Sequence, residues 1–385
     1  MSKRLGIGII GANWTLLAHC PVWRLFAETE VVAICTSRRE TAEAAAQAHS
    51  IPKAYWDYRE MAADPDIHVL DVGTQPALRF DMVRCGLEQG KHVYNCLPFT
   101  VDLTQARELV RLQQARGVVG IVDAQFRHVP AVMKLKQMIE AGELGEIFHA
   151  AMHLQMPLIA EAGVQYPLAV HSPVTRPYPW LGDSRSGASA LRNFGTHTLL
   201  NLSYLLGPIE AVIADARTFV KEWRLPDGSS ARPDTVDTAA ALVRFACGAL
   251  ANFNVSWATA DAPGYYLEVC GSRGRAVIRD PFFCDAPTAT LYFGDTRLRN
   301  HGGAVGCLVE LSAELFEVPG TPFSKTNAPP FAIPMGWMFR RMLDAIRAGT
   351  EASPSFSEAL HVHAAIIAAE RSLQTGSWVR VDEAA

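Results

Sequence analysis

Short apolar runs alternate with helix-type segments over the first 125 residues of the chain. Five of these runs are rich in β-branched residues and predict strands at residues 5–10, 30–36, 68–73, 92–95 and 118–122. Helix-type segments separate them, the clearest at residues 39–49, 76–89 and 104–116. Continuous apolar strands with helices between them are typical of a parallel sheet covered on both faces. We therefore predict an N-terminal, doubly wound Rossmann domain over residues 1–125.

Beyond about residue 146 the pattern changes to strands joined by hairpin-type turns. Strand-type runs lie at residues 146–155, 209–219, 236–246, 249–257, 265–270, 275–279 and 288–293. A proline-rich loop is predicted at 156–186 and a helix at 191–206, and helices at 335–348 and 357–373 precede the C-terminus. We therefore predict a second α/β domain over residues 126–385, built on a large, mostly antiparallel open sheet. The fold class of the whole chain is α/β.

Composition and charge limit the classes of binding partner that we expect, and they leave the predicted fold unchanged. Hydrophobic residues make up 49% of the 385-residue chain, and a formal net charge of −4 gives no strong field for nucleic acid or anionic lipid. No stretch has the ~18 apolar residues of a membrane span, and no signal-peptide pattern opens the chain. The eight cysteines form no C-x-x-C pair, and His361 and His363 diverge by about 200° on a helix, so no metal site is predicted. We expect a cytoplasmic protein with a small-molecule substrate that binds neither nucleic acid nor membrane.

The first strand leads into a candidate phosphate-binding turn. A literal G-x-G-x-x-G occurs at Gly6, Gly8 and Gly11, but the first two lie within the predicted strand and cannot form a strand-to-helix turn. The turn should begin at Gly11 and continue through Ala12, Asn13 and Trp14, where helix amides can bind a diphosphate. Asparagine tolerates a positive φ, so the turn can form without the second glycine. The pattern alone leaves an ordinary strand-to-helix turn as an alternative.

The end of the second strand bears on the choice of cofactor. NAD-preferring sites place a carboxylate there to bind the ribose 2′-hydroxyl. Here the chain reads Cys35-Thr-Ser37-Arg38-Arg39, which offers a hydroxyl beside two guanidinium groups and no carboxylate. This favours the 2′-phosphate of NADP over NAD. The alternative is an exposed basic start of a helix.

Several short segments, in order and spacing, carry a family resemblance. They are Gly90-Lys-His-Val with Pro98, Gln125-Phe-Arg-His-Val-Pro130, the run Ile139-Glu-Ala-Gly-Glu-Leu-Gly-Glu146, Asn193-Phe-Gly-Thr-His197, Asp234-Thr-Val-Asp237 and Gly271-Ser-Arg-Gly-Arg275. Together they resemble the glucose-fructose oxidoreductase / inositol dehydrogenase (Gfo/Idh/MocA) family over nearly the whole chain. The resemblance implies a Rossmann domain, an open α/β domain and a C-terminal helix that packs back on the first domain. It also implies hydride transfer between nicotinamide and a sugar-type carbon, and a homodimer or homotetramer.

The segments that carry the chemistry depart from the family pattern. The E-K-P motif is Cys96, Leu97 and Pro98, so the lysine that handles the proton of the reacting hydroxyl is absent. Asn193 replaces the aspartate of the D-x-G-x-H helix, and His197 keeps its histidine. We therefore predict His197 as the acid/base and Asn193 as an orienting group. The alternative for His197 is a core-facing helix histidine.

The remaining site predictions concern cofactor and substrate contacts. The predicted cofactor-binding residues are Gly11, Ala12, Asn13, Trp14, Ser37, Arg38, Thr74, Gln75, Cys96, Leu97, Pro98 and Gln125. The predicted substrate-binding residues are Arg127, Tyr166, His171, Arg176, Asn193 and His197. Arg127 can also be a structural ion pair, and polar loop residues usually face water.

Three functions fit these residues. The first is an NADP(H)-dependent oxidoreductase that acts on a small sugar-like or cyclic substrate. The second is a non-catalytic, dinucleotide-sensing regulator, because the missing lysine resembles the case of the fungal galactose-regulon repressor. The third is a lyase or hydrolase that works through transient oxidation by tightly held NAD.

Overall fold

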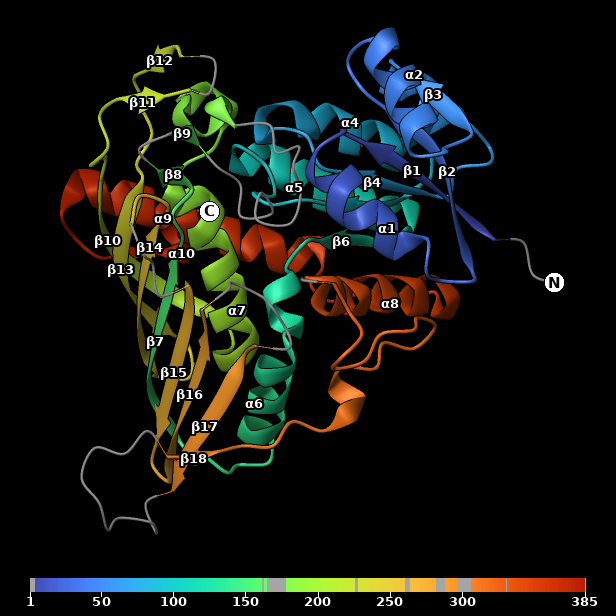
Figure 1. The fold of residues 1–385 in the computed structure, drawn as a ribbon. Helices are drawn as coiled ribbons and strands as arrows, with labels where there is room; N and C mark the ends of the chain where they lie inside the picture. Colours follow the sequence, from blue (N-terminus) through green and yellow to red (C-terminus); the bar gives the residue numbers. More distant parts are fainter. Residues whose placement is uncertain are drawn as a thin grey trace. The chain divides into compact units, whose positions relative to one another are not determined.

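The computed structural model describes residues 4–160, 163–164, 178–225, 228–259, 264–281, 288–295, 306–329 and 331–384. The chain divides into two compact units, Met1–Gln125 with Glu317–Leu360, and Phe126–Phe316 with His361–Ala385 (Figure 1). The predicted second domain, residues 126–385, includes a C-terminal helix that packs back on the first domain. In the structure, the C-terminal segment that clusters with the first unit is residues 317–360.

The first unit is built on a six-stranded parallel sheet with the order β3-β2-β1-β4-β5-β6. The strands are β1 (Leu5–Ile10), β2 (Thr29–Cys35), β3 (Lys53–Tyr55), β4 (Val69–Val72), β5 (His92–Asn95) and β6 (Gly120–Val122). The strand β3 was not predicted, because its three half-buried residues form no apolar run. The order of the strands reverses between β1 and β4, which is where ligands bind in open parallel sheets.

Helices cover both faces of this sheet. They are η1 (Thr15–His19), α1 (Cys20–Trp23), α2 (Arg39–Ala48), α3 (Tyr58–Ala63), α4 (Pro76–Glu88), α5 (Leu103–Arg116) and α8 (Ala332–Ala348). Neighbouring residues of a strand point to opposite faces. Leu70 faces α4, where a Cβ placed on Gly86 would come within 2.6 Å of it. Asp71 and Tyr94 pair in register on the opposite face, where Phe339 of α8 meets Tyr94 edge-on at 5.1 Å.

The second unit is built on a nine-stranded sheet with the order β18-β17-β16-β15-β7-β14-β13-β10-β19. The strands are β7 (Ile147–Gln155), β10 (Ile209–Arg217), β13 (Thr238–Phe245), β14 (Leu250–Ser256), β15 (Gly264–Gly271), β16 (Gly274–Asp280), β17 (Thr290–Asp295), β18 (Cys307–Leu308) and β19 (Val379–Arg380). The pair β7–β14 is parallel, and the other neighbouring pairs are antiparallel. Buried and exposed residues alternate along β13, so one sheet face forms a core and the other is open.

The remaining elements are helices and two small ribbons. The helices are η2 (Gln125–His128), α6 (Pro130–Glu140), η4 (Pro179–Gly182), η5 (Ser184–Ser186), η6 (Leu191–Gly195), α7 (Thr196–Leu206), η8 (Ala313–Leu315), α9 (Phe356–Thr375) and α10 (Val381–Ala384). The ribbons pair β8 (Ile159–Ala160) with β9 (Gly163–Val164) and β11 (Trp223–Arg224) with β12 (Ser230–Ala231). The predicted α/β class, with a doubly wound parallel sheet and a mostly antiparallel sheet, is confirmed. Within the described ranges, no helix combines the length and apolar character needed to cross a membrane.

Candidate active site

Two turns meet at the carboxyl ends of β1 and β4. Gly11 follows β1 with a φ of 111°, and its N–H donates to the Cys35 carbonyl oxygen at 3.0 Å. A Cβ on Gly73, which follows β4, would lie 2.2 Å from Thr15 Cγ2. Thr15 in turn donates its hydroxyl to the Gly11 carbonyl oxygen at 2.8 Å. The helix that follows β1 therefore starts directly against the neighbouring strand end, as a diphosphate-binding turn requires.

The glycines of the literal G-x-G-x-x-G are required for different structural reasons. Gly6 and Gly8 lie inside β1, as predicted, and a Cβ on them would meet the Asp66 carbonyl oxygen at 1.9 Å and Met61 Cε at 2.5 Å. They are glycines because the strand is closely packed there. Asn13 does not adopt a positive φ, since the non-glycine residues of the described chain with positive φ lie elsewhere. The turn therefore needs the left-handed conformation at Gly11 and not at its second position.

The arginines that follow β2 differ in their surroundings. Arg39 is held by Glu43, with Nε and Oε1 2.8 Å apart, and lies over the ring of Trp56 at 5.2 Å. Ser37 and Arg38 are exposed, and no bond of the Arg38 side chain is found among the described residues. Arg38 therefore offers a guanidinium that an anion can bind without displacing another partner.

The segment after β5 is buried and is held by an arginine from α4. Cys96 and Leu97 are 8% and 9% exposed. Arg79, itself buried, donates from one terminal nitrogen to the Cys96 carbonyl oxygen and from the other to the Leu97 carbonyl oxygen at 3.1 Å. Burial lowers the pKa of Arg79 to about 10, so it stays charged at neutral pH. A buried cation thus binds the backbone of the two residues that stand at the first two positions of the E-K-P motif.

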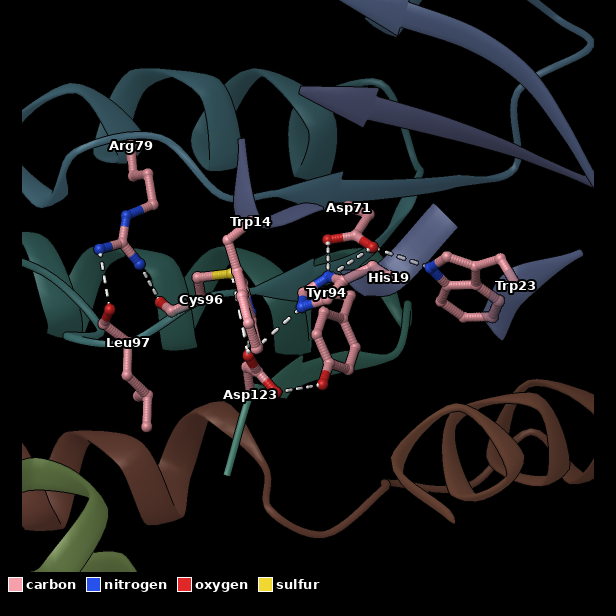
Figure 2. Close-up of polar contacts among 9 residues, drawn as sticks. All are labelled: Trp14, His19, Trp23, Asp71, Arg79, Tyr94, Cys96, Leu97 and Asp123. Atoms are coloured by element: carbon pink, nitrogen blue, oxygen red, sulfur yellow. Dashed lines mark hydrogen bonds and ion pairs between the residues drawn. The ribbon is translucent and has the colours of Figure 1, made fainter. Parts of the chain in front are cut away.

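The structure reveals a buried polar network that the sequence did not predict (Figure 2). Its centre is His19, whose Nδ1 lies 2.9 and 3.0 Å from the two carboxylate oxygens of Asp71. His19 Nε2 lies 3.4 Å from Asp123 Oδ2. Trp23 donates to Asp71 at 2.8 Å, and the Tyr94 hydroxyl donates to Asp123 Oδ1 at 2.6 Å. Two strand ends and the first helix are therefore joined through one imidazole.

Burial and the charges of neighbouring side chains set the protonation states in this network. Burial by itself lowers the pKa of His19, but the Asp71 carboxylate and the hydrogen bonds to Asp123 and Asp71 outweigh it and raise the pKa to about 10. Burial raises the pKa of Tyr94 and of Cys96 well above their usual ranges, so both keep their protons. At neutral pH the centre is an imidazolium between carboxylates.

The same residues include a group of possible metal ligands. Ligand-type atoms of His19, Asp71 and Cys96 lie within 4.8 Å of one another in the described part of the chain. His19 Nδ1 is already bonded to Asp71, and the thiol of Cys96 is protonated. Since metal binding needs a neutral imidazole and a thiolate, the group fits an ion pair better than a metal site.

The other predicted cofactor residues lie around the same strand ends. Trp14 begins the first helix, and its Nε1 lies 3.4 Å from Asp123 Oδ2. Gln125, with its amide nitrogen turned toward Asp123, donates to Oδ1 at 3.1 Å and to the backbone oxygen at 2.7 Å. Thr74 and Gln75 lie between β4 and α4, where Gln75 precedes the first helical residue. Ala12 is exposed in the turn, and Pro98 is buried after Leu97.

The second unit carries the candidate acid/base. His197 is the second residue of α7, directly after the π-helical turn η6, and is half-buried. Its ring packs against Phe126 with centroids 4.6 Å apart. Asn193 lies in η6, where its Oδ1 accepts from the Ser189 N–H at 3.3 Å. Because π-turns often occur at functional sites, the position suits a functional histidine.

Arg127 and Asn201 have structural contacts in the same unit. Arg127 is buried, donates from Nε to the Leu200 carbonyl oxygen at 2.9 Å and lies over the ring of Tyr204 at 5.4 Å. Asn201 donates to the Tyr265 hydroxyl at 2.7 Å. The predicted substrate residues Tyr166, His171 and Arg176 lie outside the described residues.

Comparisons with known proteins agree with this architecture. Residues 5–124 match the family model "Oxidoreductase family, NAD-binding Rossmann fold", and residues 132–277 match the GFO/IDH/MocA C-terminal domain. Levoglucosan dehydrogenase of Pseudarthrobacter phenanthrenivorans is 24% identical over 99% of both chains. Trans-1,2-dihydrobenzene-1,2-diol dehydrogenase of Sus scrofa is 26% identical over 92% of this chain and 91% of its own.

Solved structures agree with the fold. A levoglucosan dehydrogenase in complex with NADH and levoglucosan superposes with a TM-score of 0.81 at 23% identity, covering 99% of this chain and 100% of that chain. An NAD binding oxidoreductase from Klebsiella pneumoniae superposes with a TM-score of 0.82 at 24% identity, covering 98% and 99%. With a nicotinamide-type Rossmann unit and the matching second unit both present, the chain belongs to the GFO/IDH/MocA family of oxidoreductases.

Proposed function

We propose that the protein is an NADP(H)-dependent dehydrogenase that acts on a hydroxyl or carbonyl carbon of a small sugar-like or cyclic substrate. The observation that carries the choice of NADP is the end of β2, where the exposed Arg38 stands beside Ser37 without a carboxylate. A guanidinium binds a phosphate strongly but contributes little to the binding of a ribose hydroxyl. The adjacent Arg39 is already paired with Glu43.

The proton in this proposal is handled by His197. When bound, the nicotinamide supplies the hydride acceptor or donor. His197 takes the proton of the substrate hydroxyl during oxidation, because its intrinsic pKa suits proton transfer near neutral pH. Asn193 orients the substrate oxygen by hydrogen bonding. Leu97 makes the lysine's place apolar, which suits a cyclic substrate with fewer hydroxyl groups.

The choice of substrate class draws on two named relatives. One is a dehydrogenase of levoglucosan and the other a dehydrogenase of trans-1,2-dihydrobenzene-1,2-diol. Both names specify a hydroxylated cyclic molecule. A panel with these two compounds and simple cyclic alcohols and ketones, assayed with NADP and NAD, tests the substrate class. Tight NADPH binding without turnover across this panel would favour the regulator, and NAD retained through purification would favour the lyase or hydrolase.

Titration of NADPH and NADH into the wild type and into R38A and R39A tests the cofactor. We expect NADPH to bind more tightly than NADH, and R38A to weaken NADPH at least about tenfold while leaving NADH nearly unchanged. The matched variant R39A should change both affinities by less than about threefold, because its guanidinium already has partners. Equal loss in both variants, or tighter binding of NADH by the wild type, would contradict NADP as the cofactor.

A further inference from the structure

Asp123 contacts three of the predicted cofactor residues at once. It follows β6, and its carboxylate accepts from Gln125 while Trp14 Nε1 approaches at 3.4 Å and Cys96 Sγ at 4.0 Å. These three residues follow β6, β1 and β5, respectively. The carboxyl ends of these strands are where a Rossmann fold binds its ligand. One buried carboxylate thus contacts residues from three different strand ends that are expected to line the cofactor site.

The side chains of Tyr94 and His19 hold the Asp123 carboxylate in its orientation. The Tyr94 hydroxyl donates to its Oδ1 at 2.6 Å, and the His19 imidazolium faces its Oδ2 at 3.4 Å. His19 is itself held by Asp71, which lies inside β4 and is fully buried. The sheet therefore supports Asp123 through the Tyr94 hydroxyl and the buried pair of His19 and Asp71.

Stability alone is a weak reason for such a network. Removing several charged groups from water costs several kcal/mol for each ion, and well-packed apolar residues are often at least as stable in their place. The network also lies next to residues expected to bind the cofactor, and its ion pair spans the first helix and two strand ends. A positioning role accounts for both its composition and its place.

We propose that Asp123, held by Tyr94 and His19, is a positioning residue that keeps Trp14, Cys96 and Gln125 in the arrangement that binds the cofactor. This inference rests on the proposed function, because it requires that the protein binds a pyridine nucleotide. It predicts that the affinity for nucleotide depends on the orientation of Asp123 and not simply on the stability of the fold.

The pair of variants D123N and D71N separates positioning from stability. Both remove one carboxylate from His19, but Asp123 contacts Trp14, Cys96 and Gln125 directly, whereas Asp71 bonds to His19 and Trp23. NADPH is the probe, with affinity and emission maximum measured by its own fluorescence and stability measured by thermal unfolding. We expect both variants to lower Tm, while D123N weakens NADPH about tenfold and D71N less than about threefold. E28Q, which removes the ion pairs of Glu28 with Arg340 and Arg347 in the same unit, should lower Tm and leave NADPH binding unchanged.

Y94F provides a second route if D123N does not fold. It removes the hydroxyl that donates to Asp123 and keeps the buried ring. We expect about threefold to tenfold weaker NADPH binding and a shifted NADPH emission maximum, with the fold retained. The proposal is overturned if Y94F binds NADPH like the wild type, or if affinity losses simply follow Tm losses across D123N, D71N and E28Q.

A pH series adds a readout specific to the network. The titratable groups facing His19 are Asp71 from β4, Tyr94 from β5, and Cys96 and Asp123 after β5 and β6, while α8 contributes the ring of Phe339. With one carboxylate removed, the imidazolium loses part of its stabilisation and its pKa falls. The NADPH affinity of D123N should therefore show its titration at a lower pH than the wild type, whose His19 has a pKa of about 10. Parallel pH profiles of the two proteins would count against the proposal. Failure of the wild type to bind any nucleotide would instead remove the proposed function itself.

Discussion

Two histidines lie at the ends of π-helical turns in the described part of the chain, His19 within one and His197 just after another, and they differ in almost everything else. His19 ends η1 and is fully buried between the carboxylates of Asp71 and Asp123, which raise its pKa to about 10. His197 follows η6, is half-buried and packs against the ring of Phe126. The first histidine stays protonated near neutral pH, whereas the second keeps partial access to solvent. The comparison teaches that burial and charged neighbours decide whether an imidazole stays protonated in an ion pair, and this is why we propose His197, and not His19, as the acid/base.

Removal of the charge at His19 should have the largest effect of all. H19Q leaves the Asp71 and Asp123 carboxylates buried without their cation, so we expect a loss of about 3–5 kcal/mol in the free energy of unfolding. H197Q should cost less than about 1 kcal/mol by the same measurement, urea denaturation at pH 7. Equal losses for the two variants would remove the distinction between the histidines.

Turnover should depend strongly on His197, the histidine whose replacement costs little stability. With a substrate identified in the panel, H197N should lower kcat about 100-fold, close to 2.7 kcal/mol of barrier, because the hydroxyl proton loses its acceptor. The Tm of H197N should stay close to that of the wild type, which serves as the control for folding. An unchanged kcat would show that His197 is a core histidine and that another group moves the proton.

Stability should depend on pH through His19. Its folded-state pKa, about 10, lies above the ordinary value of 6.5, so its contribution is fully present below 6.5 and is lost as pH rises toward 10. We expect the free energy of unfolding to fall between these limits by at most about 1.4 kcal/mol for each pH unit. The slope should persist in H197Q, measured by urea denaturation at several pH values. A stability that stays flat or increases through this window would show that His19 is not a buried cation.

Much of the fold was predictable from local pattern. The apolar runs that became β1, β2, β4, β5 and β6 are each recognisable in the sequence, and so is the change to hairpin-linked strands. The short strand β3 was not predicted, because its three half-buried residues show no hydrophobic periodicity. The resemblance implied a C-terminal helix that packs back on the first domain, but the bounds 317–360 of the segment in the first unit were not predictable. They depend on packing between segments more than 200 positions apart, such as Arg340 with Glu28.

The site was predictable only where one segment carries the signal. The start of the turn at Gly11 followed from Gly6 and Gly8 lying inside a strand, and the structure has them there. The network of His19, Asp71 and Asp123 was missed, because its members are separated by about fifty positions and meet only through the parallel register of the sheet. A usable clue was Asp71 within the apolar run Val69-Leu-Asp-Val, since a lone carboxylate in a buried strand needs a partner.

The bonds of Arg79 explain how the segment after β5 can keep its backbone position when its side chains change. The guanidinium donates to the backbone carbonyl groups of Cys96 and Leu97, so α4 anchors the segment through atoms that every residue type has. Loss of the arginine would leave two carbonyl groups without their donors, whereas a different side chain at position 97 would leave both acceptors in place. The backbone after β5 is therefore fixed independently of the chemistry that its side chains offer.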